Sequence, residues 1–219
     1  MFIGHYGPAF GLKGAARPIP LWLLFVGVQW LDVLWALLVL AGVEKLRIIP
    51  GFTQGSPLDL YYMPYTHGLP GAIVCSLVFG ALVAGWLRVQ RLRVFAVACA
   101  AAFSHWLLDL VVHVPDLPLY DNHAKVGFGL WRHVRISASV EIVLVLLGAW
   151  LYARAVPARR AGADRWLWAF AALLVLLEVY NTLAPPPREA AGMAVTALVA
   201  YALLALLAAL VDRARGTSR

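Results

Sequence analysis

Apolar residues fill six stretches of the chain, each close to the length that crosses a membrane as a helix. About 20 consecutive apolar residues are needed to span roughly 30 Å of hydrocarbon. The stretches cover residues 20–43, 68–88, 92–113, 137–156, 165–184 and 191–211. This pattern predicts an all-α polytopic membrane bundle of about six transmembrane helices, forming a single integral membrane domain over residues 1–219.

The first twelve residues are also mainly apolar, but they are too short to span the membrane. One interpretation is a half-helix about 18 Å long, tucked into the bundle, which would carry His5 well inside the membrane. The alternative is an interfacial segment with a solvated His5. The segment lacks the basic start, apolar core and small-residue site of a cleavable signal, so we expect the first spanning helix to be retained.

Composition supports a membrane protein, and the distribution of charge predicts its orientation. The chain is 63% hydrophobic and 13% charged, with a mean hydropathy of +0.80, well above what soluble domains show. The net charge is +7, and the basic residues lie between the apolar stretches rather than in one solvated stripe. No nucleic-acid partner is therefore expected. If successive spans cross the membrane in alternate directions, 12 Lys and Arg residues lie on one side of the membrane and 6 on the other. We therefore expect a multi-pass protein of the bacterial inner membrane with both termini cytoplasmic.

Ionisable residues interrupt several of the apolar stretches. Such residues are costly inside a membrane and are candidates for a functional site. They are Asp32, His105, Asp109, His113, Glu141 and Glu178, with His67 at the start of the second span. The set offers acceptors and lone pairs without lysine or arginine, so a divalent metal ion is the natural missing charge. The alternatives are structural polar contacts that stabilise helix packing and, with facing histidines, a haem.

The third span carries the most informative spacing. His105, Asp109 and His113 follow one another at intervals of four residues, which places them in one stripe along a helix. His105 and His113 lie about 12 Å apart along the helix axis, which is too far for both to bind one ion without strain. Asp109 would instead bridge between a metal held by His105 and another near His113, the arrangement used in metal-assisted hydrolysis of phosphate esters.

Polar residues outside the stripe are candidates for supporting roles. Lys125, Arg132 and His133 lie in the connection 114–136, where they would hold an anionic head group or simply be solvated. Asp116 would support a ligand or act as a turn residue next to proline. Glu178 would orient a ligand from outside the metal's own shell.

Four short motifs resemble a known family, the predicted membrane-bound metal-dependent hydrolases of bacteria. The motifs are "GHYGPAFGLK" at His5, "QWLDVLW" at Asp32, "YTHGL" at His67 and "SHWLLDLVVHVPDLPL" at His105 and Asp109. The resemblance covers a metal-site core of about residues 1–145, while the spans 165–184 and 191–211 carry little of it.

That family in turn distantly resembles the zinc-dependent phospholipase C and single-strand nuclease superfamily, an all-helical fold with a three-zinc site. The resemblance implies that Asp32, His67, His105 and Asp109 bind one metal, that Asp109 bridges to a second held with His5, and that His113 and Glu141 bind a third. The chain departs from it in two places. Ser137 stands where the superfamily has a histidine, and the superfamily uses a processed N-terminal amine where this chain begins with Met1. We therefore expect one or two zinc ions, and at most three.

Together these observations predict a membrane-embedded hydrolase in which a metal-activated water attacks a phosphoester, such as a lipid head group, on the periplasmic side. Asp32 would also orient or deprotonate the water. Two other classes stay open: a transporter or permease that couples protons or solutes through intramembrane acids, and a non-catalytic membrane assembly factor. Against transport stands the lack of an inverted repeat. The oligomeric state does not follow from the sequence.

Overall fold

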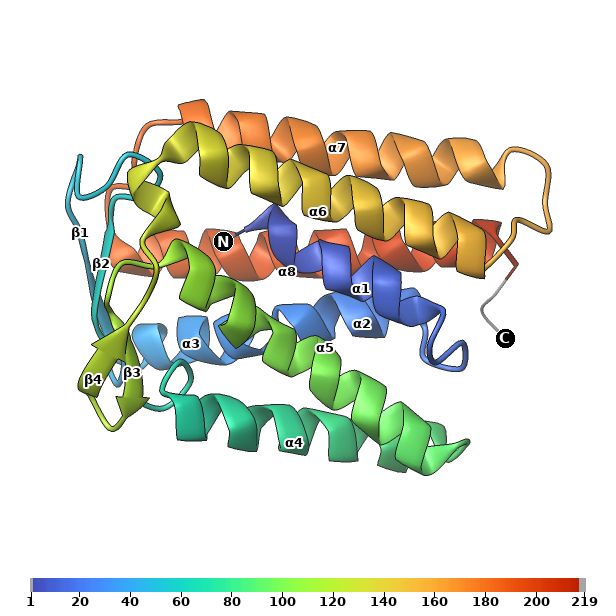
Figure 1. Ribbon diagram of the computed structural model, residues 1–219, viewed down its shortest axis with the longest axis horizontal. Helices are drawn as coiled ribbons and strands as arrows, with labels where there is room; N and C mark the ends of the chain where they lie inside the picture. Colours follow the sequence, from blue (N-terminus) through green and yellow to red (C-terminus); the bar gives the residue numbers. More distant parts are fainter. Residues whose placement is uncertain (1, 217–219) are drawn as a thin grey trace.

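The computed structural model describes residues 2–216 as a bundle of helices with two small β-hairpins at one end (Figure 1). Eight α-helices form its body within this range. The elements are η1 (Ile3–His5), α1 (Tyr6–Lys13), α2 (Leu21–Val28), α3 (Trp30–Leu40), β1 (Lys45–Ile48), β2 (Leu58–Tyr62), α4 (Leu69–Leu87), α5 (Arg91–Val112), β3 (Leu117–Tyr120), β4 (His123–Val126), η2 (Leu130–Arg132), α6 (Val134–Ala155), α7 (Ala163–Leu183) and α8 (Ala190–Ala214). The predicted all-α polytopic architecture is confirmed.

Five helices, α4 to α8, are long and apolar enough to cross a membrane. The first predicted span, residues 20–43, is instead a bent pair in which α2 and α3 meet at 54°. Gln29 lies at the break with non-helical backbone angles, and its side-chain amide donates a hydrogen bond of 3.2 Å to the Phe2 carbonyl. A buried amide group needs a hydrogen-bond partner, and the N-terminal segment provides one for Gln29 at the break.

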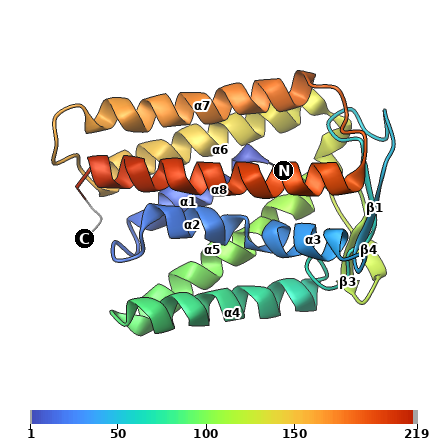
Figure 2. The ribbon, with the colours of Figure 1, turned by 180° about the vertical axis from the view of Figure 1, so that it is seen from behind.

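The N-terminal half-helix lies inside the bundle, as one of the two interpretations of the sequence expected. Both η1 and α1 pack along α6, with α1 beside α6 in Figures 1 and 2. His5 is fully buried. Two glycines allow this close approach. A Cβ on Gly7 would lie 2.5 Å from the Leu144 carbonyl oxygen, and a Cβ on Gly148 would lie within van der Waals overlap of the Gly7 carbonyl. Only glycine lets two helix backbones meet at this separation.

The two long connections predicted at one end of the bundle each contain a β-hairpin, which the apolar pattern did not indicate. Strands β1 and β2 pair antiparallel with Lys45 opposite Tyr62, and β3 and β4 pair with Leu117 opposite Val126. The Lys125 ammonium donates a hydrogen bond of 2.7 Å to the Tyr61 carbonyl. Lys125, predicted to hold substrate, therefore ties the second hairpin to the first.

A buried ion pair between α1 and α8 lies at the opposite end of the bundle. Lys13 Nζ lies 3.2 Å from Asp212 Oδ2, and the same carboxylate accepts hydrogen bonds from the Leu21 amide at 3.0 Å and the Tyr152 hydroxyl at 2.7 Å. Both charged side chains are 1% exposed. The pair thus anchors the end of α1, the start of α2 and the end of α8 to one another.

Replacing Asp212 with asparagine is expected to destabilise the fold strongly. The change leaves the Lys13 ammonium buried without its counter-charge, and breaking a buried pair costs about 3–5 kcal/mol of unfolding free energy. Thermal denaturation in detergent measures this. Arg47→Gln is the matched control, because Arg47 is 63% exposed in its pair with Asp59 and surface pairs contribute about 1 kcal/mol at most. Equal effects of the two changes would contradict the assigned role.

Candidate metal centre

Five imidazole and carboxylate side chains converge from four separate parts of the chain. His5 comes from η1, Asp32 from α3, and His67 from the connection just before α4, while His105 and Asp109 lie one turn apart on α5. Apart from Asp32, these residues are 0–2% exposed. The bundle thus buries together acidic and basic side chains that are spread over about half the length of the sequence.

Donor atoms of Asp32, His67 and His105 lie at equal distances from one another, and Asp109 lies close to both histidines. His67 Nε2 is 3.4 Å from Asp32 Oδ1, 3.4 Å from His105 Nε2 and 3.5 Å from Asp109 Oδ2. His105 Nε2 is 3.4 Å from Asp32 Oδ1 and 3.0 Å from Asp109 Oδ2. A tetrahedron with metal–ligand bonds of about 2.0–2.1 Å has edges of about 3.3 Å. The atoms of Asp32, His67 and His105 therefore have the spacing of three ligands around one tetrahedral metal ion.

Hydrogen bonds on the far side of each imidazole aim these Nε2 atoms at the cluster. His105 Nδ1 lies 2.7 Å from the carbonyl of Val28, the last residue of α2. A carbonyl only accepts, so Nδ1 carries the proton. A neutral His105 ring then presents its Nε2 lone pair to the other donor atoms, as a metal ligand must.

His67 is oriented through a relay that the sequence did not reveal. Its Nδ1 lies 2.8 Å from Thr66 Oγ1, and that hydroxyl donates a hydrogen bond of 2.6 Å to Glu44 Oε2. The hydroxyl proton is thereby engaged, so Thr66 accepts from the imidazole. The other Glu44 oxygen accepts from the amides of Tyr65 and Thr66. Glu44 precedes the first hairpin and is 1% exposed, a position whose burial follows only from the fold.

The electrostatic environment of His67 favours positive charge. Burial lowers the pKa of its imidazole, but hydrogen bonding to Asp109 and to Asp32 and the attraction of the Asp32 charge outweigh burial and raise that pKa to about 9. The two carboxylates therefore stabilise a cation at this position. A metal ion provides such a charge while leaving the imidazole neutral.

A second group consists of His5, His105 and Asp109 and shares His105 with the first. His5 Nε2 lies 3.2 Å from Asp109 Oδ1, and the His5 ring stacks on that of His105 with centroids 3.9 Å apart. His5 Nδ1 has no hydrogen-bond partner within residues 2–216. Asp109 thus directs Oδ1 at His5 and Oδ2 at His67 and His105. The bridge to a second metal held with His5, which the family resemblance implies, stays a prediction. Buried nitrogens without a partner are consistent with a ligand site.

His113 lies at the edge of the cluster. Its Nε2 is 3.6 Å from Asp109 Oδ2, and its Nδ1 donates a hydrogen bond of 2.8 Å to Asp116 Oδ1. Asp116 therefore orients a histidine, as one of the two sequence interpretations expected. His113 belongs to neither of the two groups of three potential ligands found among the described residues.

Glu141 and Glu178 lie beside the N-terminal segment. Glu141 Oε2 accepts hydrogen bonds from the amides of Phe2 and Gly4 at 2.9 and 3.0 Å, so this carboxylate holds the segment that carries His5. Glu178 is 4% exposed on α7. Neither carboxylate belongs to the two ligand groups, and Met1, whose amine the family resemblance concerns, lies outside the described residues.

Arg132 and His133 are exposed residues at the junction of η2 and α6. Neither belongs to the ligand groups of the described chain. Their predicted role in holding an anionic head group therefore stays a prediction.

Tyr201 on α8 contacts the cluster although its span was not expected to contribute. Its hydroxyl donates a hydrogen bond of 2.7 Å to Asp32 Oδ2. This leaves Oδ1 directed at the histidines and fixes the rotation of the carboxylate. A tyrosine in an apolar span gives no sequence signal that distinguishes this role from packing.

Tyr201→Phe is expected to weaken metal binding by about tenfold or more, because partners that orient ligands typically contribute 10- to 100-fold. The metal dissociation constant, measured by competition with a chelating dye, checks this. Tyr180→Phe is the matched control, since Tyr180 is 69% exposed on α7. An unchanged constant in Tyr201→Phe would contradict the orienting role.

Comparisons of the chain with models of protein families, with curated proteins and with solved structures find no match. The geometry of the cluster is therefore what supports a function.

Proposed function

We propose that the protein is a membrane-embedded, metal-dependent hydrolase of phosphoesters. The single observation that carries the proposal is the set of three donor atoms on Asp32, His67 and His105, each 3.4 Å from the other two. Two imidazoles and one carboxylate match the three protein ligands of a catalytic zinc, which keeps its fourth position for water. One or two zinc ions would fit, and His5 and Asp109 would hold the second.

The chemistry of these donor groups fits a bound cation. Two carboxylates and several imidazole nitrogens face one another in a buried space, which without a cation requires protonation to avoid repulsion. When bound, zinc supplies Lewis acidity and activates water for attack on a phosphoryl group.

The protein's own residues would divide the remaining work. The Asp32 side chain is 18% exposed, whereas those of His67 and Asp109 are 3% exposed, so the cluster is most accessible beside Asp32. This carboxylate is positioned to orient the attacking water and to accept its proton. The buried histidines hold their geometry through Nδ1 hydrogen bonds and exclude bulk solvent from the inner side.

The charge distribution supports an orientation for this reaction. The arginine-rich ends of the helices would face the cytoplasm of a bacterial inner membrane, with both termini. The hairpin end would face the periplasm, where a phospholipid head group or a small phosphoester would reach Asp32.

Hydrolysis by the purified protein tests the proposal. The protein, loaded with zinc in detergent, is incubated with a nitrophenyl phosphodiester and with short-chain phosphatidylethanolamine. We expect phosphate-ester cleavage that stops with a chelator and returns with zinc. Stoichiometric metal with no cleavage of any phosphoester would contradict the hydrolase and favour ion handling, while absence of metal from folded protein would favour an assembly factor.

A further inference from the structure

The metal centre lies well below the ends of the spanning helices. Asp32 stands eight residues before Leu40, the hairpin end of α3, which corresponds to about 12 Å along the helix axis. Tyr201, whose hydroxyl donates a hydrogen bond to Asp32, stands eleven residues after Ala190, the hairpin end of α8, which corresponds to about 16 Å. A substrate must therefore travel well into the hydrocarbon layer, through an end of the bundle or through its side.

The hairpin end of the bundle is closed above the centre. Trp131 stacks on His113 with ring centroids 4.2 Å apart, and His113 Nε2 lies 3.6 Å from Asp109 Oδ2. Both aromatic side chains are buried. The Gly55 amide donates a hydrogen bond of 2.8 Å to the Trp131 carbonyl, and Lys125 ties together the two hairpins, which lie at this end in Figure 1. A water-soluble substrate therefore meets a closed surface here.

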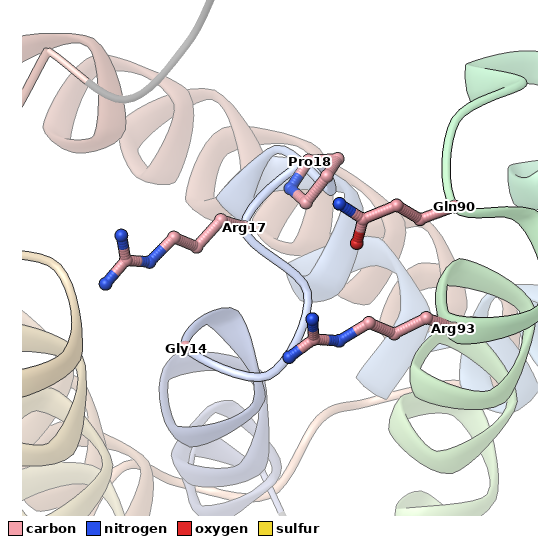
Figure 3. Close-up of a pocket in the computed structure, with 5 residues that line it drawn as sticks. All are labelled: Gly14, Arg17, Pro18, Gln90 and Arg93. Atoms are coloured by element: carbon pink, nitrogen blue, oxygen red, sulfur yellow. The ribbon is translucent and has the colours of Figure 1, made fainter.

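The opposite end is separated from the centre by packed aromatic side chains. Phe10 on α1 and Phe25 on α2 are 0–1% exposed, with ring centroids 5.1 Å apart. Beyond them lies a cleft lined by Gly14, Arg17, Pro18, Gln90 and Arg93. Its polar side chains are exposed, and Figure 3 shows Arg17 turned away from Gln90 and Arg93. This cleft belongs to the outer surface of the bundle and does not lead to the centre.

The exposed surface of the centre lies where α3 and α8 run side by side (Figure 2). The Asp32 side chain is 18% exposed, and Tyr201 is half-buried. Nearer the hairpins, Ala36 on α3 and Ala194 on α8 are fully buried, and toward the other end Val28 is fully buried as well. The exposed surface is therefore confined to the level of Asp32 and faces the side of the bundle.

The break in the first span lies at the same level. Helices α2 and α3 meet at 54°, with Gln29 at the break, three residues before Asp32. Discontinuous helices of this kind form substrate sites at mid-depth in membrane proteins. The outer surfaces of α3 and α8 are apolar, with Leu37 50% and Leu203 55% exposed. Lipid therefore surrounds the part of the bundle where the centre is accessible.

We infer that the substrate enters the centre from the bilayer, between α3 and α8 at the level of Asp32. This route rests on the proposed hydrolase function and narrows its substrate to a phosphoester carried on a lipid. Acyl chains keep such a molecule in the bilayer, where it diffuses laterally to the apolar outer surface of these helices. A water-soluble phosphoester has no such chains, and its charge keeps it out of hydrocarbon.

Cleavage by the zinc-loaded full chain in lipid vesicles tests this route. Phosphatidylethanolamine in the vesicle membrane and glycerophosphoethanolamine in the surrounding water carry the same phosphoester with and without acyl chains. The lipid is expected to be cleaved and the soluble compound to be left nearly intact. Ala202→Trp adds a bulky ring at an exposed position next to Tyr201. It is expected to slow lipid cleavage by about tenfold or more, because displacing a substrate by about 1 Å can cost 100-fold in rate.

Leu203→Trp is the matched control. It adds the same ring at an exposed position of α8, about 200° around the helix from Tyr201, and is expected to leave lipid cleavage unchanged. Ala202→Phe adds a smaller ring and is expected to slow cleavage in the same direction as Ala202→Trp. A loss of metal in Ala202→Trp therefore does not decide the outcome.

Three results would overturn the lateral route: equal cleavage of the lipid and the soluble compound, unchanged lipid cleavage in both Ala202 variants, or equal slowing in Ala202→Trp and Leu203→Trp. If the zinc-loaded chain cleaves neither compound, the hydrolase proposal fails separately. The route is then decided by a non-hydrolysable phosphonate analogue of the lipid. Cobalt-loaded protein should broaden the phosphorus NMR signal of this analogue, and Ala202→Trp should weaken the broadening; equal broadening in both proteins would refute lateral entry.

Discussion

Asp109→Asn is expected to remove both metal binding and hydrolysis while leaving the fold intact. Asp109 lies 3.0 Å from His105 Nε2 through one oxygen and 3.2 Å from His5 Nε2 through the other. An amide replaces one of these negative oxygens with a donor nitrogen, which repels a cation and points hydrogens at the imidazoles. Partners that only orient ligands already contribute up to about 100-fold in affinity. The loss for this bridging ligand should be larger.

Asp116→Asn is the matched control for this change. Asparagine keeps an oxygen that can accept from His113 Nδ1, 2.8 Å away in the present structure, so metal content should be retained. Metal content and phosphodiester cleavage are measured on both variants beside the unchanged chain. Full activity in Asp109→Asn, or equal losses in the two variants, would refute the bridging role.

Removing metal with a chelator is expected to lower the melting temperature in detergent substantially. A ligand present at 1,000 times its dissociation constant stabilises the state that binds it by about 4 kcal/mol. For a chain of about this size, each kcal/mol corresponds to about 2–4 °C. The expected shift is therefore roughly 8–16 °C. It arises because the ion compensates carboxylates and imidazoles that the fold buries together.

His105→Ala supplies the comparison for the thermal measurement. This variant removes a donor atom shared by both ligand groups, so its melting temperature should be the same with chelator and with zinc. A shift in the variant equal to that of the unchanged chain would place metal elsewhere. No shift in either would mean that the cluster is a structural network of hydrogen bonds.

Sequence patterns predicted the five long apolar helices and the inward-facing ionisable residues for a common physical reason. A membrane span must be long and apolar, so an ionisable residue such as Asp109 or His105 is conspicuous within it. The four-residue spacing on α5 then follows directly from helix geometry. These features are local in the chain, and the structure has all of them.

Sequence patterns did not predict the features that depend on tertiary contacts. The break between α2 and α3 lies in an apolar stretch and is satisfied by Phe2, a residue 27 positions away from Gln29. The Glu44 relay and the Tyr201 contact with Asp32 join segments 22 and 169 residues apart. Glutamate is common in polar connections and tyrosine is common in membrane spans. Only the tertiary fold therefore distinguishes Glu44 and Tyr201 from other residues of their kinds.

The metal content of the protein, purified gently in detergent without chelators, tests the central claim most directly. Plasma mass spectrometry on the full chain should find one or two zinc ions, or another divalent metal, per molecule, and the metal should be absent from His105→Ala. Folded protein with no bound metal, or metal retained undiminished in the variant, would contradict the proposed centre.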